Sequence, residues 1–223
     1  QLDPVLYPGM EHAADDSLTS GVTELTQNSR RLMLRLTTLC NLGCDHCTIA
    51  DIAHLGERPT ADCITEIERG RRTGCTELVF MRGEPTLRQD LKTLIGLARD
   101  LGYTLIQIQT NGRMFIYGRY LRSLVKAGAT FFEVSLFGSS ATLHDAISKE
   151  TGSFTQTVRG LSNIVRAGLG HMVTVPVIRA TVEDLTDTVG LLSGLGVRHV
   201  QFNFNRPFKL NGQWFLDPVV RLR

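Results

Sequence analysis

Three of the five cysteines in this 223-residue chain lie within eight positions of one another, as Cys40, Cys44 and Cys47. Their spacing is C-x3-C-x2-C, so three thiolates on one short loop can converge on a common centre. Thiolates are preferred ligands of zinc and of iron–sulfur clusters. The cysteine motif therefore predicts a metal centre of zinc or iron.

These three cysteines do not complete a structural zinc site or a ferredoxin-type cluster, because both normally take four protein ligands. The remaining cysteines, Cys63 and Cys75, are not arranged as a second pair. Cys63 shares an apolar helix stripe with Ile64 and Ile67, and Cys75 opens a strand, so we expect both in the core. A [4Fe–4S] cluster on three thiolates would keep one iron open to another ligand, which favours a catalytic role.

The elements that must position this loop follow from the hydrophobic pattern. Strand-like runs are expected at residues 32–38, 78–81, 104–109, 131–136, 173–178 and 199–204. Apolar residues at helical spacing lie between them, at 91–101, 121–125, 158–165 and 185–192. This alternation predicts an α/β fold of parallel strands with right-handed crossovers. Ligands of such folds bind at the carboxyl ends of the strands, and the cysteine motif follows the first strand directly.

The ends of the chain differ from this regular middle. We expect residues 1–29 to form a leader, in which residues 22–26 pair with the first strand in a short hairpin through a turn at residues 27–29. We expect residues 30–223 to form a single core domain. No helical pattern follows the last expected strand, as though the domain were cut before its sixth helix.

Composition excludes several classes of protein. Lysine and arginine number 24 against 22 acidic residues, a formal charge of +2, which gives no reason to expect nucleic acid as a partner. No run of about 18 apolar residues occurs, so we expect no membrane span. Five cysteines are too few for a disulfide scaffold of this length, which favours a reducing, cytoplasmic compartment.

Three of the expected strands carry polar side chains on one face, although buried parallel strands are normally apolar throughout. These residues are Gln107 and Gln109, then Glu133 and Ser135, then Gln201, Asn203 and Asn205. A buried polar group without a partner costs about 1–3 kcal/mol. We therefore predict a polar cavity that holds cofactor and substrate, with Gln109, Gln201, Asn203 and Asn205 as substrate contacts. The last three could contact the cofactor instead. The alternative is that these side chains satisfy one another or lie on an open edge.

The cysteine motif, placed after the first strand, resembles that of the radical SAM superfamily, and the resemblance covers about residues 30 to 207. It implies a partial (β/α)6 TIM-like barrel in which Cys40, Cys44 and Cys47 hold a [4Fe–4S] cluster. The open iron of that cluster would bind S-adenosylmethionine (SAM). The residue before the third cysteine is commonly aromatic in the family and is His46 here, so the resemblance implies that its backbone lies near the adenine.

The second strand carries independent support for this resemblance. The segment ending in Arg82, Gly83, Glu84 and Pro85 looks like the family's G-G-E-P segment, with arginine where the first glycine is usual. The resemblance implies that the backbone edges and the carboxylate of this segment face the amino group of SAM.

Later strands carry further matches. Asn111 lies in a T-N-G ending, and Ser135 lies in a segment similar to S-L-D-G, with Phe137 where aspartate is frequent. Lys149 occupies the usual arginine position of the family's H-D…R…G-S-F pattern. The resemblance thus implies that Asn111 and Ser135 contact SAM, with Lys149 or Arg179 as the partner of its carboxylate.

The implied activity is reductive cleavage of SAM to a 5′-deoxyadenosyl radical, which removes a hydrogen atom from a substrate. It implies a reductant such as flavodoxin or ferredoxin, and no catalytic residue is assigned beyond the cluster ligands. The sequence carries no signal for the substrate, so a small molecule or nucleoside and a ribosomally made peptide both stay open. An alternative from another class is a non-catalytic iron–sulfur or zinc binding module.

Overall fold

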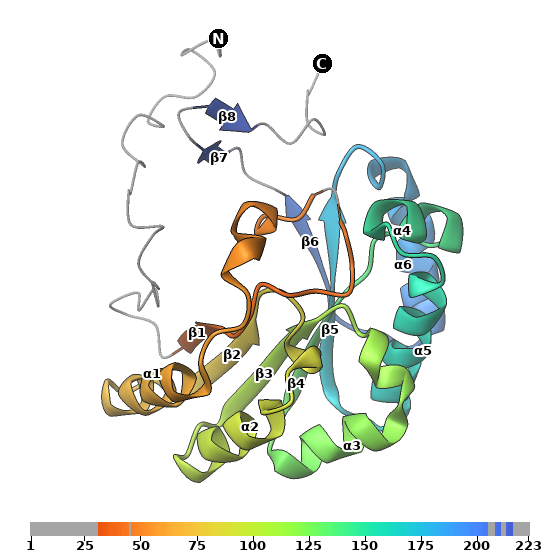
Figure 1. Ribbon diagram of the computed structural model, residues 1–223. Helices are drawn as coiled ribbons and strands as arrows, with labels where there is room; N and C mark the ends of the chain where they lie inside the picture. Colours follow the sequence, from red (N-terminus) through yellow and green to blue (C-terminus); the bar gives the residue numbers. More distant parts are fainter. Residues whose placement is uncertain (1–30, 45, 205–207, 211–212, 216–223) are drawn as a thin grey trace.

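A computed structural model describes residues 31–44, 46–204, 208–210 and 213–215 of the chain (Figure 1). Six parallel strands form one sheet in the order β1-β2-β3-β4-β5-β6, which is also their order along the chain. The strands are β1 (Arg31–Arg35), β2 (Glu77–Met81), β3 (Leu105–Thr110), β4 (Phe131–Ser135), β5 (Gly170–Val177) and β6 (Val200–Phe204). Because β1 and β6 are the two edges of this sheet, the barrel that it forms is partial and open.

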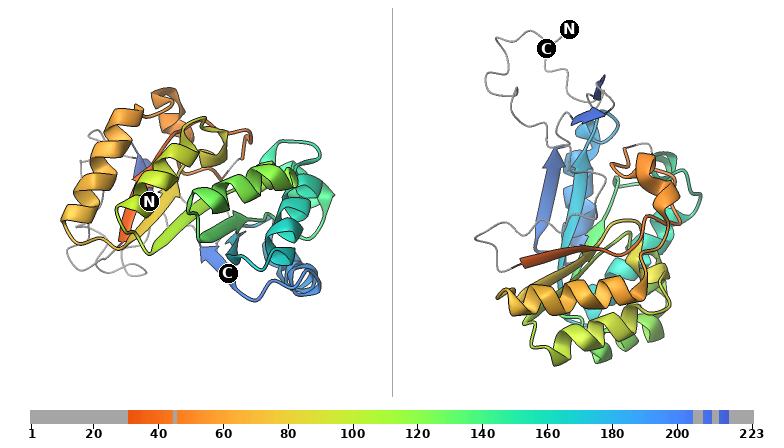
Figure 2. Two further views of the ribbon diagram at one scale, coloured as in Figure 1. Left: turned by 90° about the horizontal axis from the view of Figure 1, so that it is seen from below. Right: turned by 60° about the vertical axis from the view of Figure 1, so that its left-hand side comes forward.

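Helices connect the successive strands. They are α1 (Thr60–Arg72), α2 (Leu91–Asp100), α3 (Gly118–Ala127), α4 (Ala141–Ser148), α5 (Ser153–Arg166) and α6 (Leu185–Gly194). Short 3-10 turns precede four of them, at η3 (Ala50–Leu55), η4 (Pro85–Leu87), η5 (Arg113–Ile116) and η6 (Val182–Asp184). The sheet is strongly twisted, so that β1 and β6 run in clearly different directions (Figure 2).

The apolar stripes predicted from the sequence explain this packing. One continuous core contains the buried faces of the strands and helices, including Leu34 of β1, Phe80 of β2 and Leu94 of α2. Cys63 on α1 and Cys75 before β2 are 0% and 2% exposed, which confirms the prediction that both are core residues. Burial of these side chains on the helix side of the sheet leaves the opposite face free to line a cavity.

The α/β fold of parallel strands is confirmed, and each strand begins or ends within three residues of its expected place. One helix and one pair of strands were missed. Helix α4 has only eight residues and lies in a stretch where we identified only a sequence motif. An antiparallel pair, β7 (Phe208–Leu210) and β8 (Gln213–Phe215), follows β6. The predicted leader and hairpin of residues 1–29 lie outside the described residues.

Strand β6 differs from the other strands in its burial, because its last four residues are all exposed. Phe202 and Phe204 are 38% and 63% exposed, since no helix of the described residues covers this edge. None of the described helices is both long and apolar enough to span a membrane.

Candidate functional site

The cysteine loop leaves β1 and is fastened to the structure before the first cysteine. The hydroxyl of Thr38 donates to the carbonyl of Ala53 at 3.0 Å and to that of Gly56 at 3.1 Å. The backbone N–H of Thr38 also donates to the carbonyl of Gly56, at 3.0 Å. The loop is thus closed on itself through η3, and the three cysteines lie on the segment between these ties.

A second, smaller apolar cluster holds the middle of the loop. Phe137, Ile147 and Ile178 form its buried part, and Leu42 and Cys44 pack against it. The N–H of Gly43 donates to the carbonyl of Ser148 at 2.9 Å. The loop residues between the first and second cysteines are therefore fixed against the end of helix α4.

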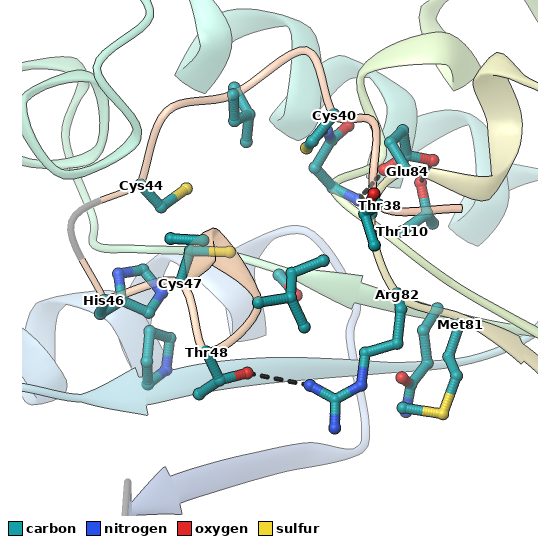
Figure 3. A pocket seen from close by; sticks show the side chains of 18 of the residues that line it. Thr38, Cys40, Cys44, His46, Cys47, Thr48, Met81, Arg82, Glu84 and Thr110 are labelled. Atoms are coloured by element: carbon teal, nitrogen blue, oxygen red, sulfur yellow. Dashed lines mark hydrogen bonds between the residues drawn. The ribbon is translucent and has the colours of Figure 1, made fainter. Parts of the chain in front are cut away.

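Cys40, Cys44 and Cys47 line one cavity of about 850 Å³ at the carboxyl ends of the strands, and their sulfur atoms point toward a shared space (Figure 3). Within the described residues, no three His, Cys, Asp or Glu side chains converge closely enough to hold a single metal ion. A cluster that takes one thiolate per iron requires the sulfur atoms to stand further apart than the ligands of one ion. The donor set, three thiols that line one cavity, fits such a cluster.

Burial is the main influence on Cys40. Loss of water raises the pKa of this thiol, and the negative charges of Glu84 and Cys47 raise it further. The backbone N–H of Leu42 acts in the opposite direction by stabilising the thiolate. Because metal binding needs the thiolate, any metal centre bound by Cys40 would have to displace its proton.

Glu84 is 1% exposed and joins the loops that follow β2 and β3. Its carboxylate accepts hydrogen bonds from the backbone N–H of Asn111 at 2.7 Å, from the hydroxyl of Thr110 at 2.8 Å and from the N–H of Thr86 at 3.0 Å. Burial raises the pKa of Glu84, and these hydrogen bonds oppose the rise. The carboxylate is thus a structural brace on one side of the cavity.

The neighbouring Gly83 shows why this segment needs glycine. Its φ is 54°, and a Cβ at this position would collide with the carbonyl oxygen of Leu39. The N–H of Glu84 donates to the same carbonyl at 2.8 Å. The β2 loop therefore lies directly against the residue that precedes Cys40.

Asn111 and Arg113 connect the β3 loop to the cysteine loop. The amide of Asn111 donates to Oδ1 of Asn41 at 2.7 Å and lies 4.0 Å from Sγ of Cys40. The guanidinium of Arg113 donates to the carbonyl of Asn41, to Gln156 at 2.6 Å and to Glu150 at 3.1 Å. These contacts set the position of the first cysteine relative to β3 and α5.

A hydrogen-bonded polar network forms the inner face of the sheet. The carboxylate of Glu133 accepts from Gln107 at 2.6 Å, from Gln109 at 2.9 Å and from Thr174 at 2.8 Å. Three of these four residues, Gln109, Glu133 and Thr174, also line the cavity. Both interpretations of the polar stripe therefore hold in part, since the side chains satisfy one another and face a cavity.

Most of the predicted site residues meet at this cavity. Its lining includes the three cysteines, His46, Gly83, Glu84, Gln109, Asn111, Ser135 and Asn203. Pro85 is buried beside it as the first residue of η4. Lys149 and Arg179 are exposed and are not among the described lining residues, nor is Gln201. Asn205 lies outside the described residues.

The structure adds residues that sequence reasoning did not assign to the site. Thr48 and Thr174 line the cavity, and Arg82 extends its side chain into it. Arg113 had no distinguishing signal, because it begins the short 3-10 turn η5, which is too short to show a periodic pattern. Glu133 was noted in the polar stripe, and its central place in the network depends on neighbouring strands that one strand's pattern does not reveal.

The fold and the site together define a class of partial, parallel α/β barrel. Its three cysteines lie on the loop after the first strand, beside a cavity at the carboxyl ends of the strands. The model of the Radical SAM superfamily matches residues 34–192. The chain belongs to the radical SAM superfamily.

Relatives within the family differ in their named activities. The chain is 30% identical over 171 residues to the AdoMet-dependent heme synthase of Oleidesulfovibrio alaskensis, covering 75% of this chain and 43% of the synthase. It is 31% identical over 194 residues to the mycofactocin maturase MftC of Mycobacterium tuberculosis, covering 80% of this chain and 47% of the maturase. The chain thus spans less than half the length of these two curated relatives.

Solved structures with the same fold have lower sequence identity. Native anSMEcpe with bound AdoMet and the Cp18Cys peptide has a TM-score of 0.65 and 18% identity, over 80% of this chain and 54% of that one. Streptococcus suis SuiB has a TM-score of 0.68 and 15% identity, over 82% of this chain and 41% of SuiB. At these identities the likeness extends to the fold alone.

Proposed function

We propose that this chain is the core of a radical SAM enzyme that holds a [4Fe–4S] cluster on Cys40, Cys44 and Cys47. The observation that carries the proposal is that all three thiols point into one cavity, beside the loops of β2 and β3. Three thiolates leave one iron of such a cluster without a protein ligand. When bound there, the cluster and SAM would supply one-electron chemistry that releases a 5′-deoxyadenosyl radical able to remove hydrogen from a substrate.

In this proposal the chain itself contributes positioning. Glu84 fixes the β2 loop against the β3 loop, and Asn111 holds Asn41 and approaches Cys40. A rigid loop keeps the thiolates in place without reorganisation when the cluster is loaded. The amide of Asn111 also brings an N–H donor near a ligand sulfur, and such donors tune the reduction potential of iron–sulfur clusters.

The SAM contacts in this proposal come from the cavity lining. Gly83 and Glu84 would present backbone edges to the amino group, and Ser135 and Asn111 would offer hydrogen bonds from the neighbouring strands. The backbone of His46 would lie near the adenine. Pro85 would shape the same segment from its buried position.

Lys149 and Arg179 are less well placed to bind the SAM carboxylate. Both lie outside the described lining, so in this proposal either side chain would have to move to reach the site. Lys149 lies beside the cysteine loop, since a Cβ on Gly43 would stand 3.5 Å from the Cβ of Lys149.

The substrate would enter over the inner face of the sheet, where Gln109 and Asn203 line the cavity. The polar side chains around Glu133 favour a small molecule, because they suit a compact ligand with hydrogen-bonding groups. A peptide is the second candidate, supported by the likeness to MftC and by the fold shared with SuiB, which has been solved bound to the precursor peptide SuiA. A flavodoxin or ferredoxin would supply the electron.

Anaerobic reconstitution with iron and sulfide, followed by SAM and a strong reductant, tests this function. The wild-type chain should form 5′-deoxyadenosine, and C44A should not, because it lacks one cluster ligand. Iron incorporation without any 5′-deoxyadenosine would favour a non-catalytic iron–sulfur module instead. Zinc binding with no iron incorporation would favour the zinc alternative.

A further inference from the structure

Arg82 holds an unusual backbone conformation at the cavity. Its φ is 70°, and among the described residues only Lys149 shares a positive φ without being glycine. An L side chain is disfavoured there because its Cβ crowds the backbone. Glycine would adopt the same conformation without strain. Because strained residues concentrate at functional sites, an arginine at such a position indicates a functional role for its side chain.

The turn that carries Arg82 is held firmly from the following residues. Gly83 is packed against the carbonyl of Leu39, and the N–H of Glu84 donates to that same carbonyl. Because Leu39 immediately precedes Cys40, the base of the Arg82 side chain has a fixed place beside the cysteine loop.

The guanidinium of Arg82 has unused hydrogen-bonding capacity. Its Nη1 donates to the hydroxyl of Thr48 at 2.9 Å, next to Cys47 (Figure 3). It forms no ion pair with a described residue. A guanidinium carries five N–H donors in a planar fork, so most of them are available to a ligand.

The charge of the cavity makes Arg82 distinctive. Arg82 is the only lysine or arginine among the described residues that line it, whereas Glu84 and Glu133 contribute carboxylates. An anionic group would be repelled by these carboxylates and by cysteine thiolates, except beside Arg82. Met81, Ile49 and Ala50 line the same cavity and offer apolar surface to the body of such a ligand.

We propose that Arg82 is a specificity-determining residue that binds a carboxylate of the substrate. This inference rests on the proposed function, because it assigns a substrate contact at the same cavity. A carboxylate fits the planar fork of arginine with two parallel hydrogen bonds. Its single negative charge is matched by the single cation of the described lining, whereas a doubly charged phosphate would lack a second one.

The competing explanation is that Arg82 only ties the β2 loop to Thr48. Two variants separate these roles. R82Q removes the charge, and T48V removes the hydroxyl while it keeps Arg82. If Arg82 only holds the β2 loop through this hydrogen bond, both variants lose the same contact and should bind a ligand equally well.

The test uses the full chain, reconstituted with iron and sulfide and saturated with SAM. Fluorine NMR titrations follow 4-fluorobenzoate as the carboxylate probe and 4-fluorobenzamide as its neutral match. We expect the wild-type chain to bind the benzoate at least about tenfold more tightly than the benzamide. R82Q should lose that preference, R82K should keep part of it, and T48V should keep most of it.

Equal affinity of the wild-type chain for both probes would overturn the inference, as would an unchanged preference in R82Q. If T48V lost the preference to the same degree as R82Q, the role of Arg82 would be limited to its hydrogen bond with Thr48. Benzoate binding only in the absence of SAM would assign Arg82 to the carboxylate of SAM, and would also overturn the inference.

Cleavage of SAM by the same wild-type sample separates this inference from the proposed function. A sample that cleaves SAM without preferring the benzoate contradicts the inference alone. A sample that prefers the benzoate through Arg82 without cleaving SAM contradicts the proposed function alone.

Discussion

The backbone N–H of Asn111 donates a 2.7 Å hydrogen bond to the buried carboxylate of Glu84, and so joins the loop after β3 to the loop after β2. Asn111 in turn contacts Asn41 and approaches Cys40 through its side chain. The position of the first cysteine thus depends on a carboxylate in the loop after β2, the strand that pairs directly with β3.

Replacing Glu84 with glutamine tests this brace. The substitution leaves one oxygen and places an NH2 group opposite a donor of Asn111 or Thr86. We expect the free energy of unfolding to fall by about 2 kcal/mol, because a buried donor loses its acceptor. Denaturant titration measures the change, with E183Q, at an exposed carboxylate, as the control that stays within about 0.5 kcal/mol of wild type. Equal stability of the two variants would show that Glu84 is not a brace.

The two groups of cysteines should separate in an assay of bound iron. C40A, C44A and C47A should each retain little iron after anaerobic reconstitution, because each removes a proposed ligand. C63A and C75A should bind as much iron as wild type, since both residues lie in the core, and should lose about 1 kcal/mol of stability. Iron loss in C63A or C75A, in a variant that still unfolds cooperatively, would contradict the ligand assignment.

Arg113 should matter for how firmly the loop keeps its metal. R113Q loses donors to the carbonyl of Asn41 and to Glu150, so we expect a loss of about 1–2 kcal/mol in the free energy of unfolding. Iron release to a chelator should also become faster than in wild type. R119Q, at an exposed arginine of α3, is the matched control. Unchanged release in R113Q would mean that the cysteine loop is held by its other contacts.

Substitution of Arg82 by glycine should separate stability from ligand binding. Glycine relieves the strain of a positive φ, so we expect the free energy of unfolding to stay equal or to rise by about 1 kcal/mol. R82A keeps the strained conformation and should be less stable than R82G. A fall of about 1 kcal/mol or more in R82G would show that the hydrogen bond to Thr48 outweighs the strain.

His144 predicts a dependence of stability on pH. This ring is 0% exposed, its Nδ1 accepts from the N–H of Phe137 at 3.2 Å, and burial lowers its pKa to about 4. The unfolded chain binds the proton near pH 6.5 and the folded chain only near pH 4, so stability from this group is complete above pH 6.5 and falls between these values.

The shift of the His144 pKa corresponds to about 3 kcal/mol of lost stability between pH 7 and pH 4. Urea titrations at several pH values measure this loss. The H144Q variant should show a flatter pH profile, because glutamine does not titrate. A wild-type profile that matches that of H144Q over this range would contradict the buried neutral histidine.

Much of the fold could be predicted because its signals are local. The alternation of strands and helices and the burial of Cys63 both follow from the spacing of apolar residues along single elements. Helix α4 was missed because it is short. Its neighbour α5 begins where Asp145 accepts from the N–H groups of Gly152 and Phe154, a pattern visible only once both segments are placed.

The candidate site could be predicted where a motif carries it and not where contacts cross strands. Asn111 and Ser135 were identified from motifs and do line the cavity. The network around Glu133 joins residues from three strands. The hydrogen bond from Arg113 to the carbonyl of Asn41 joins residues 72 positions apart. Such pairs depend on sheet register, which a single sequence does not reveal. Lys149 matched a motif by position, yet its side chain does not line the cavity.

The most direct test of the central claim is an electron paramagnetic resonance measurement on the reconstituted, dithionite-reduced chain, with and without SAM. If Cys40, Cys44 and Cys47 hold a [4Fe–4S] cluster with one open iron, the reduced protein gives a cluster signal whose g-values shift when SAM is added. A cluster signal that is identical with and without SAM, or no cluster signal from iron-loaded protein, would contradict the account.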